Sequence, residues 1–364
     1  MKMKSIAWLV GACVIVGMAT VVALAQNQPA DPLQQTAQAL FQPLPEVMLD
    51  PDRPFSQELV DLGKLLYYDP RLSLSGFVSC NSCHNLATYG VDNLPTSLGH
   101  RWAVGPRNSP TVLNAALHAS QFWDGRAADV EEQAQGPVLN PIEMAMPHAD
   151  YTIERLASMP GYVDAFAAAY PDHAEPLTYV NMADAIGAFE RTLTTPDRFD
   201  DFLKGDGDAL SDLEREGLQV FINYGCAGCH GGAAIGGTVM ARFGVVEAYW
   251  EATREFVTID SPTMPMDVGR FAVTQDPADL YVFKSPSLRN ITRTYPYFHD
   301  GSLWDLRAAT QIMARVQLGR EITESDLDAL MAWYETLVGE IPAYALQLPV
   351  LPASSMTTPR PSNR

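Results

Sequence analysis

Apolar residues recur at the three- and four-residue spacing of helices in several stretches of the chain. The first stretch is 57–68, where leucines share one face and Ser56 precedes them as the expected N-cap. Helical patterns return over 151–170, with an interruption at Pro160, and over 179–193. The alternation of apolar and polar residues that marks a strand is not convincing anywhere. The pattern therefore predicts a helical protein.

The second half of the chain repeats this order. Ser211 and Glu214 have the spacing of a capping box, and the helix that they begin is expected to end at Gly225. A last amphipathic helix is predicted over 327–337, with Thr323 at its start. The chain therefore looks like two similar helical units in succession.

Long stretches without periodicity separate these helices. Residues 85–147 and 231–293 are rich in Gly and Pro, and such long irregular stretches usually carry function. Residues 26–55 are polar and are interpreted as a loose leading segment, and the composition of the tail after Pro352 predicts disorder. The fold class predicted is all-α, with two fused units and long irregular loops.

The N-terminus has the pattern of an export signal. Lys2 and Lys4 precede an apolar run over 6–24, and Ala23-Leu24-Ala25 supplies the small residues of a cleavage site. We therefore predict that residues 1–25 are a signal peptide and that the mature protein is periplasmic. The competing interpretation is an uncleaved membrane anchor, because the apolar run is nearly long enough to span a bilayer.

The charge of the chain limits its partners. The formal net charge is −19, so nucleic acid and anionic lipid are poor partners. A small protein with a positive docking face is a better one, because complementary fields speed encounter. The simpler interpretation is that most of these charges only confer solubility.

The cysteines point to a cofactor. Of five, Cys13 lies in the predicted signal and the others form two CxxCH motifs, Cys80-Asn81-Ser82-Cys83-His84 and Cys226-Ala227-Gly228-Cys229-His230. In this motif two thiols form thioethers with a haem and the histidine binds its iron. A zinc site would need four ligands gathered together, which this spacing does not offer. A redox dithiol is also less favoured, so two covalent c-type haems are predicted.

The motifs divide the chain. Its 364 residues are enough for two domains. We predict a cytochrome c-like domain at 26–200, joined by the C-terminal segment 340–364, and a second one at 201–339. Each iron has a sixth position, and the group that fills it decides between electron transfer and catalysis. From the residues alone the candidates stay open: His100, His118, His148, His173, His299 and several methionines.

A family resemblance narrows these candidates. The segment 80–148 contains Ser-Leu-Gly-His100, Phe-Trp123-Asp-Gly-Arg and Asn-Pro-Ile-Glu143-Met-Ala-Met. Together with Asp-Pro-Arg-Leu-Ser at 69–73 and the segment 294–301, it closely resembles the bacterial di-haem cytochrome c peroxidases. The resemblance extends over about residues 35–340.

The resemblance implies a role for each residue near the first haem. The haem of His84 would be the low-potential site where peroxide reacts. His100 would be the distal ligand that leaves on activation, and Glu143 the acid and base that moves protons during cleavage of the O–O bond. Gln133 would orient peroxide, and Trp123 would lie between the haems on the electron route.

The second haem would accept electrons at high potential, with His230 as proximal ligand. Met313 matches the axial methionine of the family, and a thioether ligand raises the potential. Its rivals in this sequence are Met240, Met264 and Met266.

The resemblance also implies a calcium ion between the domains. Its ligands would be the Asn108 side chain and the carbonyl oxygens of Thr294 and Pro296, an all-oxygen set that suits a hard cation. One departure is the region 231–282, which is longer than the family pattern leads us to expect.

The predicted function is thus reduction of hydrogen peroxide to water, with electrons from a small cytochrome c or copper protein. A homodimer is a further expectation of the resemblance. One alternative is a MauG-like oxidase acting on a protein substrate, a branch with tyrosine in place of the axial methionine. The other is a non-enzymatic di-haem electron carrier, against which Gln133 and Glu143 argue.

Overall fold

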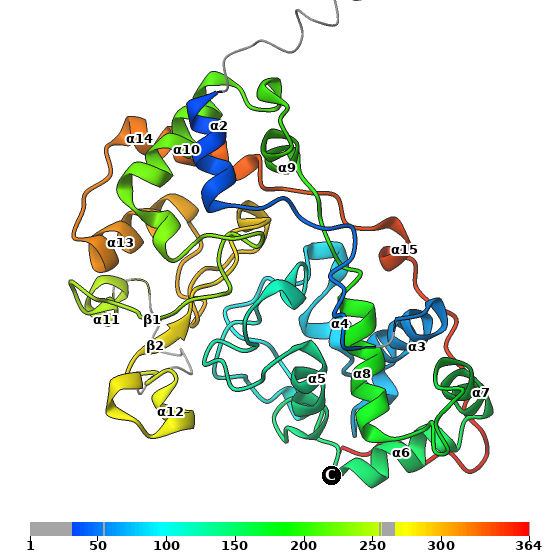
Figure 1. Cartoon of the computed structure of the whole chain (residues 1–364). Coiled ribbons are helices and arrows are strands. Elements are labelled where there is room, and N and C mark those ends of the chain that lie inside the picture. The colour runs from blue at the N-terminus through cyan, green and yellow to red at the C-terminus, as the bar shows by residue number, and fades with distance from the viewer. Residues whose placement is uncertain (1–30, 54, 255, 257–265, 364) are drawn as a thin grey trace, which may run out of the picture.

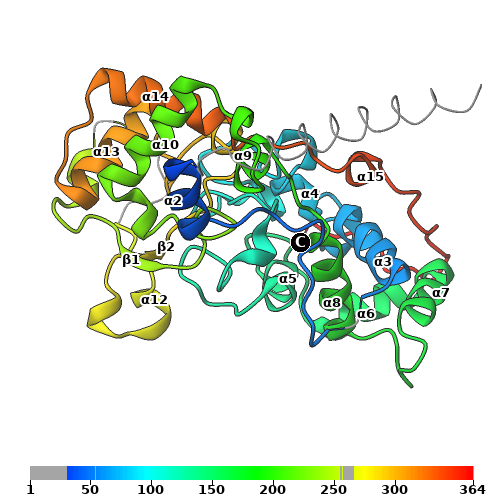
Figure 2. The same cartoon turned by 45° about the horizontal axis from the view of Figure 1, so that its top comes forward.

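The computed structural model describes residues 31–53, 55–254, 256 and 266–363. Over these residues the chain is mainly helical, and its strands are β1 (Met240–Arg242) and β2 (Val282–Lys284), which pair antiparallel. The sequence predicted no strand, because three residues are too few for an alternating pattern to be recognised. The predicted signal peptide and Met264 lie outside the described residues. The helices form two groups, which Figures 1 and 2 show from different sides.

The first group is built on the crossing of α3 (Gln57–Tyr68) and α8 (Tyr179–Glu190). At this crossing a Cβ on Gly63 would overlap the carbonyl oxygen of Ala185, so only glycine lets the two backbones approach so closely. Ser56 caps α3 as predicted, since its hydroxyl accepts from the amide of Leu59. The other helices of this group are α4 (Cys80–Cys83), α5 (Val130–Leu139), α6 (Ala149–Ala157) and α7 (Pro160–Ala169).

The second group repeats this construction. Here α10 (Asp212–Tyr224) crosses α14 (Glu324–Glu335), and a Cβ on Gly217 would overlap the carbonyl oxygen of Ala329. The predicted capping box is present, because the amide of Ser211 donates to Glu214 at 2.7 Å. The remaining helices are α9 (Arg198–Leu203), α11 (Tyr249–Thr253), α12 (Phe271–Thr274) and α13 (Leu306–Leu318). The repeated order of the sequence is thus a repeated helix crossing.

The leading segment was predicted wrongly. Instead of a loose stretch, it forms α2 (Pro32–Leu40), with Asp31 as N-cap. Ala37 and the residue after the helix, Phe41, are buried with the aromatic core of the second group, although their sequence position had placed them in the first unit. The reason is that α2 has an apolar face, which is hard to recognise in the sequence among polar residues. In the folded protein this face packs against the apolar core of the second group.

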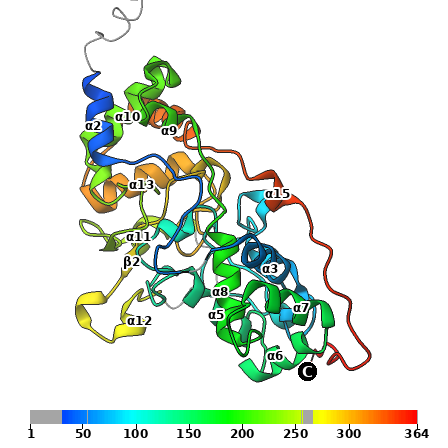
Figure 3. The same cartoon turned by 45° about the vertical axis from the view of Figure 1, so that its right-hand side comes forward.

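The C-terminal tail returns to the first group. It begins with α15 (Ala343–Leu346), whose Ala345 is buried in the core of α3 and α8. The tail after Pro352, for which composition predicts disorder, instead lies along this group, as Figure 3 shows. Its backbone is held there, since the amide of Ser362 donates to the carbonyl of Leu74 at 2.9 Å and Ser158 donates to Thr358 at 2.8 Å.

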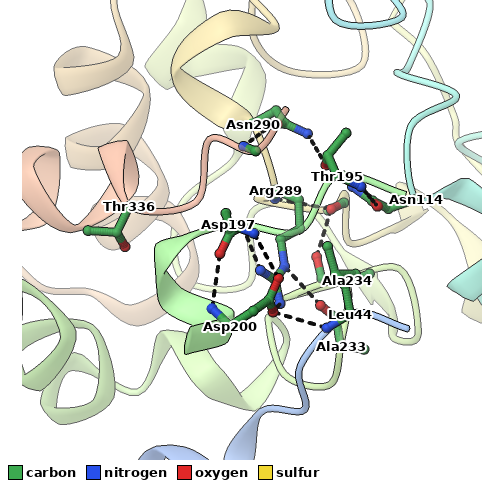
Figure 4. A network of polar contacts seen from close by, with 12 residues as sticks. Leu44, Asn114, Thr195, Asp197, Asp200, Ala233, Ala234, Arg289, Asn290 and Thr336 are labelled. Atoms are coloured by element: carbon green, nitrogen blue, oxygen red, sulfur yellow. Dashed lines mark hydrogen bonds and ion pairs between the residues drawn. The ribbon is translucent and has the colours of Figure 1, made fainter. Parts of the chain in front are cut away.

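A buried polar junction joins the two groups (Figure 4). Asn114 from the first half and Asn290 from the second both donate to the hydroxyl of Thr195, at 2.8 and 2.9 Å. Both asparagines have left-handed backbones with φ of 61°, a conformation that asparagine tolerates better than most residues. The same threonine therefore ties matching positions of the two halves together.

An arginine and two aspartates complete this junction. Arg289 donates to Asp197 at 2.6 Å and to Asp200 at 2.8 Å, and all three side chains have no solvent exposure. Asp200 also accepts from the amide of Leu44, in the segment that follows α2. The network thus connects α9, the chain before α3 and the loop after β2, and fixes how the two groups meet.

Candidate functional site

A proline carbonyl orients each CxxCH histidine. Nδ1 of His84 lies 2.9 Å from the carbonyl oxygen of Pro110, and Nδ1 of His230 lies 3.1 Å from that of Pro286. Burial holds the pKa of both imidazoles below its ordinary value, to about 4 for His230. A neutral imidazole that donates through Nδ1 keeps Nε2 for a metal. Both histidines therefore have the protonation state that an iron ligand needs.

These prolines lie at matching places in an internal repeat. Residues 109–125 and 285–301 share Ser-Pro, Asn and Phe-x-Asp-Gly at the same spacing. Their backbones match too, with positive φ at Phe122 and Phe298. Trp123 and His299 hold equivalent positions in the two repeats. The sequence interpretation considered His299 only as an iron ligand, and the repeat spacing is the signal that could have related it to Trp123.

A large cavity adjoins the second motif. Cys226, Cys229 and His230 line it on one side, and Met313 lines it from α13. Of the rival methionines, Met240 is not among the residues that line this cavity and Met266 is 38 % exposed. A histidine and a thioether facing one apolar cavity beside two cysteines are a donor set that fits a c-type haem.

Beside the first motif lies a carboxyl group with a perturbed pKa. Burial raises the pKa of Glu143, against the opposing effects of Arg126 and of the Asn140 amide, which donates to the carboxylate at 2.6 Å. The Glu143 charge in turn contributes to raising the pKa of the Cys83 thiol to about 11, although burial is the main cause. Glu143 therefore lies within electrostatic range of the first CxxCH motif.

His100 is brought to the same place. Its backbone amide donates to the carbonyl of Glu143 at 2.7 Å, and a Cβ on Gly99 would overlap the carbonyl oxygen of Ile142. The imidazole is buried, and its Nδ1 has no hydrogen-bond partner among the described residues. Two loops far apart in the sequence thus pack together beside the first motif.

The turn that carries His100 is strained. Arg101 and Trp102, which follow it, have φ of 57° and 61°, a region costly for side chains of this size. Trp102 is also 81 % exposed. The side chains of Arg101 and Trp102 therefore have little packing, whereas His100 itself is buried against Glu143.

Trp123 lies where the two groups meet. Its indole Nε1 donates to the carbonyl of Asn108 at 2.9 Å, and its own carbonyl accepts from the amide of Lys284 at 2.7 Å. Its ring meets that of His299 edge to face, with centroids 6.3 Å apart. Both rings line the cavity of the second motif, so an aromatic residue of the first half forms part of a wall in the second.

Comparison with known proteins identifies this arrangement. The model of the family "Di-haem cytochrome c peroxidase" matches residues 57–208. Cytochrome c551 peroxidase of Pseudomonas aeruginosa is 46% identical over 338 residues, covering 92% of this chain and 93% of that protein. The chain belongs to the di-haem cytochrome c peroxidase family.

Two further comparisons agree. Cytochrome c551 peroxidase of Nitrosomonas europaea is 44% identical, over 84% of this chain and 87% of that protein. Among solved structures, a MauG-like protein associated with microbial copper homeostasis superimposes with a TM-score of 0.72 at 27% identity, covering 84% of this chain and 97% of that one. The fold and the sequence of this di-haem peroxidase therefore point to the same family.

The remaining predicted site residues, Gln133 and the calcium ligands, make no hydrogen bond to Glu143 or His100 among the described residues. Gln133 lies half-buried on α5, and no hydrogen bond in the described structure joins its amide to Glu143 or His100. Asn108, Thr294 and Pro296 all line the one cavity. The Asn108 amide nitrogen donates to the carbonyls of Leu94 and Pro95, which leaves its oxygen as the atom that could bind a cation.

Two aromatic residues of the long region 231–282 pack against His299. Phe243 and Tyr249 stack on each other at 4.6 Å, and both rings meet that of His299 edge to face. Phe283, just after this region, stacks on His299 at 4.2 Å. Arg107 of the first half donates to Asp267 at 2.6 Å. No helix among residues 31–53, 55–254, 256 and 266–363 is long and apolar enough to cross a membrane.

Proposed function

We propose that this protein reduces hydrogen peroxide to water beside the first CxxCH motif, with electrons that a donor protein delivers beside the second. The observation that carries this proposal is the Glu143 carboxyl group, which is buried with a raised pKa next to His100 and Cys83. Family membership supplies the reaction class, since its relatives are named cytochrome c551 peroxidases.

The two haems would be held by matching residues in two cytochrome c-like domains. Cys80 and Cys83 would attach one haem, and Cys226 and Cys229 the other. When bound, the irons supply the redox chemistry, one accepting electrons singly and the other reducing peroxide. We place the domain boundaries at 26–200 with 340–364, and at 201–339, except that α2 packs with the second domain.

Glu143 would move the proton that this reaction requires. Cleavage of the O–O bond needs a base that takes a proton from one peroxide oxygen and returns it to the departing one. A carboxyl with a raised pKa can do both, and the Asn140 amide fixes its orientation. Gln133 would orient the peroxide from α5.

The other site residues would control access and the electron route. His100 would occupy the sixth position of the first iron at rest, and the strained turn after it would let it withdraw. Met313 would be the second iron's sixth ligand. Trp123, tied to both halves by hydrogen bonds, would bridge the two sites.

Further parts of the proposal concern the surroundings of the enzyme. We propose a calcium ion bound by the Asn108 side chain and the carbonyls of Thr294 and Pro296. We also propose export to the periplasm by residues 1–25, a small cytochrome c or copper protein as donor, and assembly as a homodimer. The charge of −19 favours a donor with a positive docking face.

Substitution of the acid tests the proposal. In Glu143→Gln, peroxide turnover with a reduced cytochrome should fall at least a hundredfold. The reason is that the glutamine amide cannot take up the peroxide proton and return it. Glu154→Gln, an exposed residue of the same domain, is the control and should keep full activity. Turnover of the Glu143 variant at the wild-type rate, with both haems attached, would show that the assigned acid is wrong.

A further inference from the structure

The wall of the cavity beside the second CxxCH motif contains a buried lysine. Lys284 ends β2 and is 7 % exposed, and its Nζ donates to the carbonyl of Ser120 at 2.7 Å. No carboxylate of the described residues forms an ion pair with it. Asp124, the acid that acts on Lys284 electrostatically, is already paired with Arg107 and Arg126. Burial lowers the pKa of Lys284 to about 7, although Asp124 raises it, so an anion beside Nζ would favour the ammonium form.

A histidine stands beside this lysine. Nδ1 of His118 lies 3.1 Å from Nζ of Lys284, and it is the accepting nitrogen when the lysine is an ammonium. The proton of the neutral ring is then on Nε2, and Nε2 is buried without a hydrogen-bond partner among the described residues. Gly237 packs against the ring so closely that a Cβ there would overlap it, which keeps the imidazole in place. The pair therefore presents two N–H donors that nothing else in the described structure accepts.

Both residues belong to the lining of the cavity beside the second CxxCH motif. Lys284 and His118 line it together with Cys229, His230 and Met313. The next residue, Ser285, donates through its hydroxyl to the carbonyl of Cys229 at 2.8 Å, so the end of β2 is fastened to the motif itself. An anion in this position would be part of the group that fills the cavity. The haem of the proposed function carries carboxylates of this kind, its propionates.

We propose that Lys284 and His118 bind a propionate of the haem attached at Cys226 and Cys229, and that this contact raises the reduction potential of that haem. The sign follows from charge. An ammonium beside the propionate offsets a negative charge near the iron, which favours the reduced, less positive iron. Burial of the lysine strengthens the effect, because buried charges are screened less than exposed ones. This proposal rests on the second haem of the proposed function, but not on peroxide turnover.

The test is a redox titration of the purified protein with both haems attached. In Lys284→Met, the equilibrium constant for reduction of the second haem should fall at least tenfold, which is about 59 mV for one electron. Lys204→Met removes the same charge from an exposed position and should change the constant less than twofold. Lys284→Arg keeps the charge and should stay within threefold of the wild type.

Several outcomes would overturn the assignment. A wild-type potential in Lys284→Met would show that no propionate depends on the lysine. A shift confined to the first haem would place the contact there instead. If the methionine variant does not assemble, His118→Phe removes the Nε2 donor together with the Nδ1 acceptor of Lys284 and should lower the constant at least threefold; no change would refute the proposal. If the wild-type protein shows no peroxide turnover, the proposed function is refuted. The reduction potentials of the wild type and the Lys284 variants would still test this contact.

Discussion

Arg289 offers the sharpest test of how the two halves are held together. Its guanidinium donates to Asp197 and Asp200 in the interior, and all three side chains have no solvent exposure. In Arg289→Met the apolar volume stays similar, but two carboxylates remain without their cation. Breaking a buried pair in this way costs about 3–5 kcal/mol. Arg289 also donates to the carbonyl of Ala233, and loss of that bond adds to the effect.

The loss should depend on pH. Burial already raises the pKa of Asp197 from 3.8 to about 6, although Arg289 lowers it. Because the folded state then binds more protons than the unfolded state, stability falls as pH rises from about 4 to about 6. Without Arg289 this pKa rises further, so the variant should keep losing stability above pH 6, where the wild type no longer does.

Urea unfolding of the haem-loaded protein at pH 5 and pH 8, followed by far-ultraviolet circular dichroism, measures both effects. Arg198→Met is the matched control, since it breaks an ion pair between Arg198 and Glu214 in which Arg198 is 53% exposed. Such a pair is worth less than about 1 kcal/mol. If both variants lose the same small amount, or if the Arg289 variant is as stable at pH 8 as at pH 5, the reasoning is refuted.

Three further predictions concern packing, ligation and the metal. Gly217→Ala should lose about 1–3 kcal/mol in urea unfolding, because its Cβ overlaps a carbonyl of α14, whereas Gly207→Ala, with nothing within 4 Å, should not. Half-reduction of the wild type should produce a high-spin, five-coordinate haem in the visible spectrum, and His100→Gly should show it already when oxidised; an electron carrier would show none. Chelation with EGTA should abolish peroxide turnover and added Ca²⁺ restore it, with Asn108→Ala needing more Ca²⁺; activity that is indifferent to EGTA would argue against the calcium site.

Local sequence patterns predicted much of the helical framework. The break at Pro160, the N-cap at Ser56 and the capping box at Ser211 are all where the sequence placed them. Each depends on residues within one turn, so no distant contact was needed to recognise it. The CxxCH motifs are equally local, because two thiols and one imidazole within five residues contain the whole attachment chemistry. The family resemblance then added roles that spacing alone could not assign.

The tertiary structure decided which distant segments share a site. The apolar face of α2 is not recognisable in the sequence because polar residues surround it. Only its packing against the aromatic core shows that α2 is part of the second group. Likewise, nothing near Lys284 in the sequence shows that it is buried beside His118. Burial and charge pairing depend on contacts between residues far apart in the chain, which local sequence patterns do not reveal. The sequence by itself predicted much of the helical framework and, through the CxxCH motifs, two covalent haems, whereas the packing of the two halves against each other set the environment around the two motifs.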